Sequence, residues 1–80
     1  MDDDVRAFEE AIICLGLGQA KFAASSDTAK SIEKLLIPEG YARCIWAERR
    51  PFGDKAFGLT DKGINAYKIL EKANGRPFHH

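Results

Sequence analysis

The sequence predicts a small α+β domain in which helices come first, a β-hairpin follows and one more helix closes the chain. Three observations predict this class. Apolar residues recur at helical spacing near both ends, strand-forming residues gather between 41 and 60 around a loop-forming cluster, and Ser, Thr and Asp stand before helical segments as caps. An 80-residue chain that is 45% hydrophobic and 30% charged has room for one core. We expect a single domain over residues 1–75 and a flexible tail over residues 76–80.

The first segment, residues 2–15, has the pattern of an amphipathic helix. Three aspartates open it, where negative charge is favoured by the positive end of the helix dipole. The sequence Gly16-Leu17-Gly18 follows and is expected to end the helix rather than to bind phosphate, because no strand precedes it. The apolar stripe of this helix consists of Val5, Phe8, Ala11 or Ile12, and Leu15.

A second helical region begins after a short Ala-rich stretch, residues 19–24, which we expect to form a brief helix of its own. The capping sequence Ser25-Ser26-Asp27 comes next, and each of its side chains is a good N-cap. A full helix is therefore predicted over residues 27–37, before Pro38 removes a backbone donor. Its apolar side consists of Ala29, Ile32, Leu35 and Leu36, with Asp27, Lys30 and Lys34 opposite.

Residues 41–60 are predicted to form a β-hairpin. The first strand, residues 41–50, is rich in strand formers, residues 51–54 are loop formers, and residues 55–60 return in an extended pattern. The alternation leaves the buried face of the first strand open. That face is either the one with Tyr41, Ile45 and Ala47 or the one with Ala42, Cys44 and Trp46.

The stretch FGLTDKGINAYKIL, residues 57–70, marks the passage from the second strand to the last helix. We expect Thr60 or Asp61 to cap this helix and Asn74-Gly75 to end it. Helical spacing places Ile64, Tyr67, Leu70 and either Ala73 or Asn74 on the side that faces the core.

This order of elements is typical of a winged helix-turn-helix domain, and residues 31–63, SIEKLLIPEGYARCIWAERRPFGDKAFGLTDKG, resemble the recognition helix and wing of MarR-like bacterial regulators. In such proteins a leucine near the helix end, a Gly before the first wing strand, a basic loop and a Leu-Thr-x-x-Gly sequence follow at similar spacing. The chain lacks the extra terminal helices that form the dimer in that family. The matching positions are Leu36, Gly40-Tyr41, Arg49-Arg50, Asp54-Lys55 and Leu59-Thr60-Asp61-Lys62-Gly63.

The resemblance implies a DNA-binding transcriptional regulator that acts on double-stranded DNA. Helix 27–37 would lie in the major groove, and the wing, residues 49–55, would contact the DNA backbone. Hydroxyl groups and lysines suit phosphate oxygens, and the attraction of the lysines would weaken with salt. The predicted DNA-binding residues are Ser25, Ser26, Thr28, Lys30, Ser31 and Lys34 on the helix and Arg49, Arg50 and Lys55 on the wing.

The charge of the chain is balanced overall but unevenly distributed. Residues 1–18 carry a net charge of −4, and residues 19–60 and 61–80 carry +2 each. Acidic side chains also interrupt the predicted DNA-binding segments, and the pI of about 6.7 is low for a DNA-binding domain. The alternative function is therefore a winged-helix module that binds a protein partner and does not bind DNA.

Other functional classes have little support in the sequence. We expect no enzyme, cofactor or metal site, because no set of polar groups converges and both histidines, His79 and His80, are the last two residues. The spacing of Cys14 and Cys44 predicts buried, reduced thiols. No apolar run is long enough to cross a bilayer, which predicts a soluble, cytoplasmic protein without a membrane partner.

A weak homodimer is expected, because regulators of this kind commonly bind two half-sites as dimers. The surfaces available for it are the acidic first helix and the last helix. Tyr67, Ile69 and Leu70 spread around more of the last helix than one buried stripe requires, which predicts an exposed apolar patch there.

Overall fold

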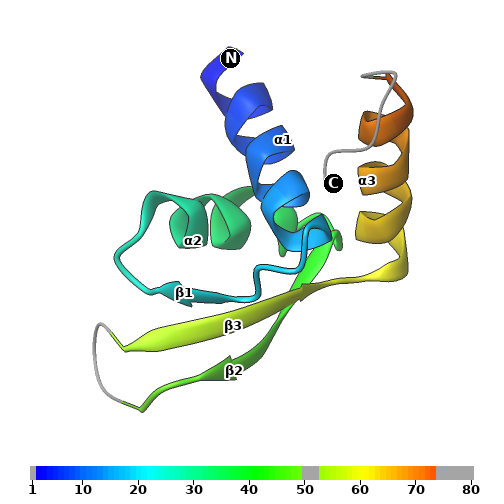
Figure 1. Cartoon of the computed structure of the whole chain (residues 1–80). Helices are drawn as coiled ribbons and strands as arrows, with labels where there is room; N and C mark the ends of the chain where they lie inside the picture. Colours follow the sequence, from blue (N-terminus) through cyan, green and yellow to red (C-terminus); the bar gives the residue numbers. More distant parts are fainter. Residues whose placement is uncertain (1, 50–52, 74–80) are drawn as a thin grey trace.

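The computed structural model describes residues 2–49 and 53–73 and shows three helices beside a three-stranded antiparallel sheet. The strand order is β1-β3-β2, and Figure 1 shows the helices on one side of the sheet. The α+β class is confirmed. The predicted tail, the predicted helix end at Asn74-Gly75 and Arg50 lie outside the described residues. The elements are α1 (Asp2–Gly16), β1 (Lys21–Ala23), α2 (Asp27–Ser31), the π-helical η1 (Ile32–Leu36), β2 (Ala42–Ala47), β3 (Asp54–Leu59) and α3 (Asp61–Ala73).

Helix α1 ends as predicted, at a glycine that reverses the chain. Gly18 has a φ of 101°, a conformation that costs glycine little. Its N–H donates to the Leu15 carbonyl at 3.1 Å, and the N–H of Gln19 donates to the Cys14 carbonyl at 3.2 Å. This pair of bonds is the Schellman arrangement, which satisfies the last carbonyl groups of a helix.

The predicted brief helix over residues 19–24 is wrong, because this segment contains strand β1. Lys21 pairs with Ala56 and Phe22 pairs with Lys55, antiparallel to β3. Phe22 is buried and its ring centroid lies 6.1 Å from that of Phe57. A strand of three residues is long enough to place the Phe22 side chain in the core and to form backbone hydrogen bonds with β3. The tertiary pairing thus overrides the helical preference of the Ala-rich composition.

The helix predicted over residues 27–37 is present. Its first part is α-helical and its second part is π-helical. It begins as α2 and continues as η1, where the N–H of Ile37 donates to the Ile32 carbonyl at 3.0 Å. Ala29, Ile32 and Leu36 are buried, as their spacing predicts, and Leu35 is half-buried. The chain then reverses at Gly40, whose φ is 79°.

A bulge in β2 resolves which face of the hairpin is buried. Cys44 pairs with Phe57 but Trp46 pairs with Ala56, so Ile45 is an extra residue. Ala42 is buried on the helix side of the sheet, whereas Ile45 and Trp46 are 61% and 49% exposed. The predicted alternatives each assumed one uninterrupted alternation, and the bulge makes both of them only partly correct.

The Leu-Thr-x-x-Gly sequence joins the end of the hairpin to α3. The Thr60 hydroxyl donates to the Gly40 carbonyl and accepts a 3.2 Å hydrogen bond from the N–H of Gly63, which confirms Thr60 as a cap. A Cβ on Gly63 would stand 2.0 Å from the Tyr41 carbonyl oxygen. The amine of Lys62 donates to the Glu39 carbonyl at 2.7 Å and lies 4.4 Å from the Tyr41 ring centroid.

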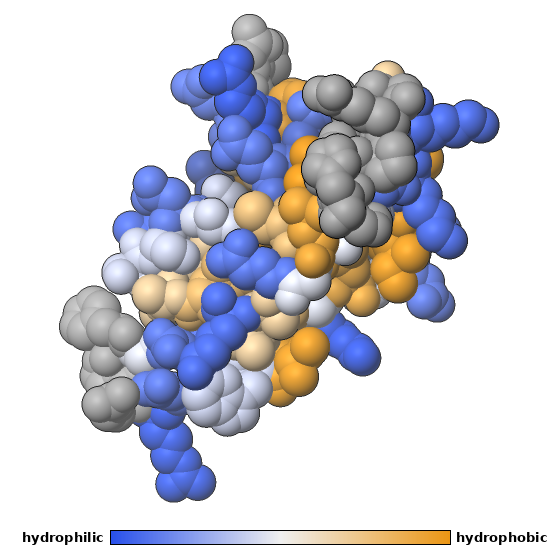
Figure 2. Space-filling view, viewed as in Figure 1, coloured by the Kyte–Doolittle hydropathy of each residue, from blue (hydrophilic) through white to orange (hydrophobic). Residues whose placement is uncertain are grey.

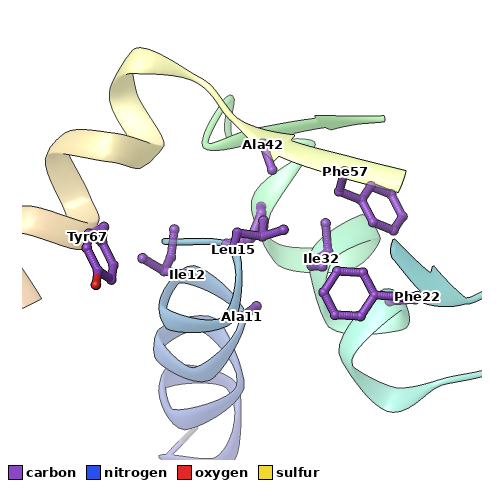
Figure 3. Close-up of a cluster of buried hydrophobic side chains, with 10 residues drawn as sticks. Ala11, Ile12, Leu15, Phe22, Ile32, Ala42, Phe57 and Tyr67 are labelled. Atoms are coloured by element: carbon purple, nitrogen blue, oxygen red, sulfur yellow. The ribbon is translucent and has the colours of Figure 1, made fainter. Parts of the chain in front are cut away.

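The core lies between the sheet and the helices (Figure 3). Figure 3 shows Tyr67 of α3 directed toward Ile12 of α1, and Phe57 and Phe22 on the other side of the core, next to Ile32. Burial, and after it the charge of Glu71, raises the pKa of the Tyr67 hydroxyl. The buried set is Ala11, Ile12, Leu15, Phe22, Ala29, Ile32, Leu36, Ala42, Phe57 and Tyr67.

Three predictions of burial are wrong. Val5 and Ile64 are exposed, and on α3 the buried position next to Ile64 is taken by Gly63. This small residue lets α3 approach the Tyr41 carbonyl, so the buried side of the helix begins at Gly63 and not at Ile64, while Tyr67 and Leu70 pack on the core as predicted. Cys44 is exposed as well, while Cys14 is half-buried, and both are free thiols.

Candidate nucleic-acid interface

The outward side of the α2–η1 helix carries Lys30 and Lys34, the two lysines predicted to contact DNA. Both side chains are exposed, and their spacing of four residues places them on one side of the helix. Asp27 and Glu33 are also exposed on this helix. The surface is therefore of mixed charge. Its attraction for an anion depends on whether the acidic side chains are paired with other cations.

The wing residue Lys55 forms an ion pair with one of those acidic side chains. Its amine lies 2.8 Å from a carboxylate oxygen of Glu33, in an ion pair between β3 and η1. The hydrogen bond to Glu33 raises the pKa of Lys55, so the amine is charged and paired at neutral pH. Because 22 residues separate the partners, no local pattern in the sequence could have indicated this pair.

The same ion pair brings the predicted helix and the predicted wing together. Glu33 lies between Lys30 and Lys34 in sequence, and Lys55 is the second residue of β3, next to the hairpin loop. Arg49 is exposed where the other side of the hairpin enters this loop. The Glu33–Lys55 pair therefore brings η1 close to the start of β3. Arg50 is outside the described residues.

The hydroxyl-bearing residues of the predicted interface differ in what they contact. Ser25 is exposed in the turn before α2. The Ser26 oxygen accepts a 3.1 Å hydrogen bond from the N–H of Ala29 and thus caps the helix. Thr28 and Ser31 line a shallow pocket against α1, together with the acidic Glu10. Thr28 and Ser31 are thus directed more toward α1 than toward a ligand approaching Lys30 and Lys34.

Replacement of Ser26 by Ala is expected to lower the free energy of unfolding by about 1 kcal/mol, because the Ala29 N–H loses its acceptor. Urea unfolding followed by circular dichroism measures this effect. Ser25→Ala is the matched control and is expected to change stability by less than about 0.5 kcal/mol, since that residue is exposed. Equal losses in the two variants would contradict the capping role.

Two further basic residues, Lys21 and Arg43, belong to none of the sites predicted from the sequence. Lys21 of β1 lies 3.5 Å from the Asp54 carboxylate and 5.9 Å from the ring centroid of Trp46. Arg43 of β2 is exposed on the same sheet face, opposite Gly58. These contacts join three strands and depend on the register of the sheet, which has no local sequence signal.

In the described ranges 2–49 and 53–73, no group of three or more His, Cys, Asp or Glu side chains is arranged to hold a metal ion. None of the helices in those ranges has the length and apolarity needed to cross a membrane.

Comparisons with known proteins do not place the chain in a family. No protein-family model matches the sequence, no curated protein matches it, and no solved structure matches the fold.

Proposed function

We propose that this protein binds double-stranded DNA as a small winged-helix transcriptional regulator of the MarR-like type. The outward side of α2–η1, with Lys30 and Lys34, enters the major groove, and the hairpin loop with Arg49 contacts the adjacent backbone. The observation that carries the proposal is the Glu33–Lys55 ion pair, because it holds the loop end of the hairpin beside the lysine-bearing helix. A helix and a hairpin loop on one surface can follow the groove and the neighbouring phosphates of a duplex.

The charge balance predicts how such binding depends on conditions. The few cations of this surface would bind phosphates mainly through release of counterions, so affinity falls steeply as salt rises. Glu33 opposes binding twice, by repelling phosphate and by holding the Lys55 amine. Binding is thus expected to be weak, to appear at low salt and to fade at moderate salt.

The double variant Lys30→Gln/Lys34→Gln is expected to reduce the slope of log affinity against log salt by about 2, since each lysine neutralises about one phosphate. Fluorescence anisotropy with a short generic duplex over a range of salt concentrations measures the slope. The matched control is Lys68→Gln/Lys72→Gln, an exposed pair with the same spacing on α3. Equal losses in the two double variants would show nonspecific charge attraction and contradict the proposed interface.

A gain-of-binding variant tests the same surface in the opposite direction. Glu33→Gln removes a negative charge and releases Lys55, so it is expected to tighten binding and to steepen the salt dependence by about one further phosphate contact. Asp4→Asn, which removes an exposed negative charge on α1, is the control for net charge. Failure of the unchanged protein and of Glu33→Gln to bind duplex at low salt would sink the proposal.

A protein-interaction module is the second candidate, and the exposed acidic side chains of the α2–η1 helix, Asp27 and Glu33, favour it. Acidic groups on this helix repel phosphate and suit a protein partner better than a duplex. Absence of duplex binding at low salt, with an intact fold by circular dichroism, would favour this candidate.

A further inference from the structure

A cavity opens on the surface where the end of α1, the end of β3 and one side of α3 meet. Its volume is about 460 Å³, within the roughly 300–1,000 Å³ that is usual for small-molecule sites. Its apolar walls are the side chains of Leu15, Leu59, Ile64 and Tyr67. Figure 2 shows hydrophobic surface among hydrophilic side chains beside the lower part of α3, where this helix follows β3 in Figure 1. The cavity suits the apolar part of a small ligand.

A glycine leaves space for a ligand in this cavity. Gly16 is the last residue of α1, and a Cβ there would overlap the Tyr67 ring. The ring therefore packs directly against the backbone of α1, and no side chain at position 16 fills the space beside it. Ile64, near the start of α3, is 41% exposed. A ligand that covers this apolar side chain removes it from water, which favours binding.

Two charges of opposite sign stand at the cavity, Lys68 and Glu71 of α3. Their spacing of three residues places them on one side of the helix, with Cβ atoms about 5–6 Å apart. Within residues 2–49 and 53–73, neither side chain forms an ion pair with another residue. Burial first, and then the nearby Glu71 carboxylate, raises the pKa of the Tyr67 hydroxyl, so this carboxylate lies at the cavity wall. A ligand that pairs with both charges must carry a carboxylate and an ammonium group close together.

We propose that this cavity binds a free α-amino acid with an apolar side chain of about the size of leucine. The ligand side chain enters between Leu59, Ile64 and Tyr67, its carboxylate faces Lys68 and its ammonium group faces Glu71. A free amino acid carries both charges on one carbon atom beside its apolar group, whereas a residue inside a peptide carries neither. The charges of the cavity therefore favour the free amino acid over a peptide segment.

The proposed site is separate from the surface proposed to bind DNA. Helix α1 contacts both α2 and α3, and Figure 1 shows α1 between them. The cavity lies on the α3 side of α1, whereas Lys30 and Lys34 belong to α2 and η1. Binding of the amino acid thus does not rest on DNA binding, and it is measured without DNA.

Titration with L-leucine, followed by the NMR signals of the backbone amides, tests the proposal. The expected Kd is millimolar, because exposed ion pairs contribute little and Lys68 is exposed. The signals of Gly16, Leu59 and Lys68 are expected to shift most. Glycine lacks the apolar group and is expected to bind at least about tenfold more weakly. If leucine at tens of millimolar shifted none of these signals, the proposal would be overturned.

Blocked derivatives of leucine test the two charges. Leucinamide lacks the carboxylate and N-acetylleucine lacks the ammonium group, so each is expected to bind about three- to fivefold more weakly than leucine. N-acetylleucinamide lacks both groups and represents leucine inside a peptide. If it bound as tightly as leucine, the cavity would accept a peptide side chain and the proposal would be wrong.

Matched variants assign each charge of the ligand to one residue. Lys68→Gln is expected to weaken leucine binding about three- to fivefold and to leave the Kd of leucinamide unchanged, because leucinamide has no carboxylate. Glu71→Gln is expected to weaken leucine binding similarly and to leave the Kd of N-acetylleucine unchanged. The control is Lys72→Gln, an exposed lysine on the same helix outside the cavity. Circular dichroism establishes that each variant is folded. Equal losses for leucine and leucinamide in Lys68→Gln would contradict the assignment.

Discussion

Replacement of Gly63 by Ala is expected to lower the free energy of unfolding by about 2–3 kcal/mol. Within a helix this substitution ordinarily stabilises a protein by up to about 1 kcal/mol, because glycine is the poorer helix former. Here the new Cβ would stand 2.0 Å from the Tyr41 carbonyl oxygen, and a backbone atom cannot turn away as a side chain can. Either α3 or the turn at Tyr41 must move, and the Thr60 bonds that join them must weaken.

Thermal unfolding by circular dichroism measures the effect of Gly63→Ala. In a domain of this size a loss of 1 kcal/mol lowers the Tm by roughly 4–8 °C. Asn65→Ala is the control in the same helix, where the side chain is exposed and a change within about 0.5 kcal/mol is expected. A Gly63→Ala variant as stable as the unchanged protein would show that α3 does not approach the Tyr41 carbonyl so closely.

Replacement of Phe57 by Ala is expected to cost about 3–5 kcal/mol, the largest effect of any single substitution proposed for this chain. Phe57 is fully buried and packs beside Phe22 at the centre of the sheet. Domains have a total stability of about 5–15 kcal/mol, and a small core places this one toward the lower end. The variant is therefore expected to lose most of its cooperative unfolding transition in urea.

The control for Phe57→Ala is Trp46→Ala, measured at low protein concentration to exclude dimer formation. Trp46 is the larger side chain and lies on the next strand, but it is half-exposed. Its removal is expected to cost less than about 1 kcal/mol in the monomer. If the tryptophan variant lost as much stability as the phenylalanine variant, the assignment of inner and outer sheet faces would be wrong.

The helices could be predicted from the sequence because their signals are local. Capping residues and apolar spacing indicate α1, the α2–η1 helix and α3, and Thr60 is one of the two residues expected to cap α3. Strand β1 could not be predicted in the same way. Its three residues contain one buried aromatic, and only the pairing of Phe22 with Lys55 across the sheet makes them extended.

The errors in side-chain placement have long-range causes. Ile64 fits the helical stripe of α3 but is exposed, because Gly63 takes the position next to the Tyr41 carbonyl. A glycine gives no hydrophobic signal in the sequence, so this contact could not be predicted. In β2 a single extra residue at Ile45 changes which side chains share a face, so no uniform alternation could describe the strand. Of the candidate interface, Lys30, Lys34 and Arg49 are exposed as predicted, and the partner of Lys55 could be found only in three dimensions.

The Thr60 hydroxyl has a consequence for how the domain opens. It joins the turn after η1 to the first turn of α3, while Lys62 reaches the carbonyl of Glu39 in the same turn. Local opening in proteins follows units that can separate without breaking many bonds. Helix α3 cannot leave the core without releasing the turn that leads into β2. The last helix and the start of the hairpin are therefore expected to unfold locally as one unit. Helix α3 thus helps to hold the start of the hairpin in place.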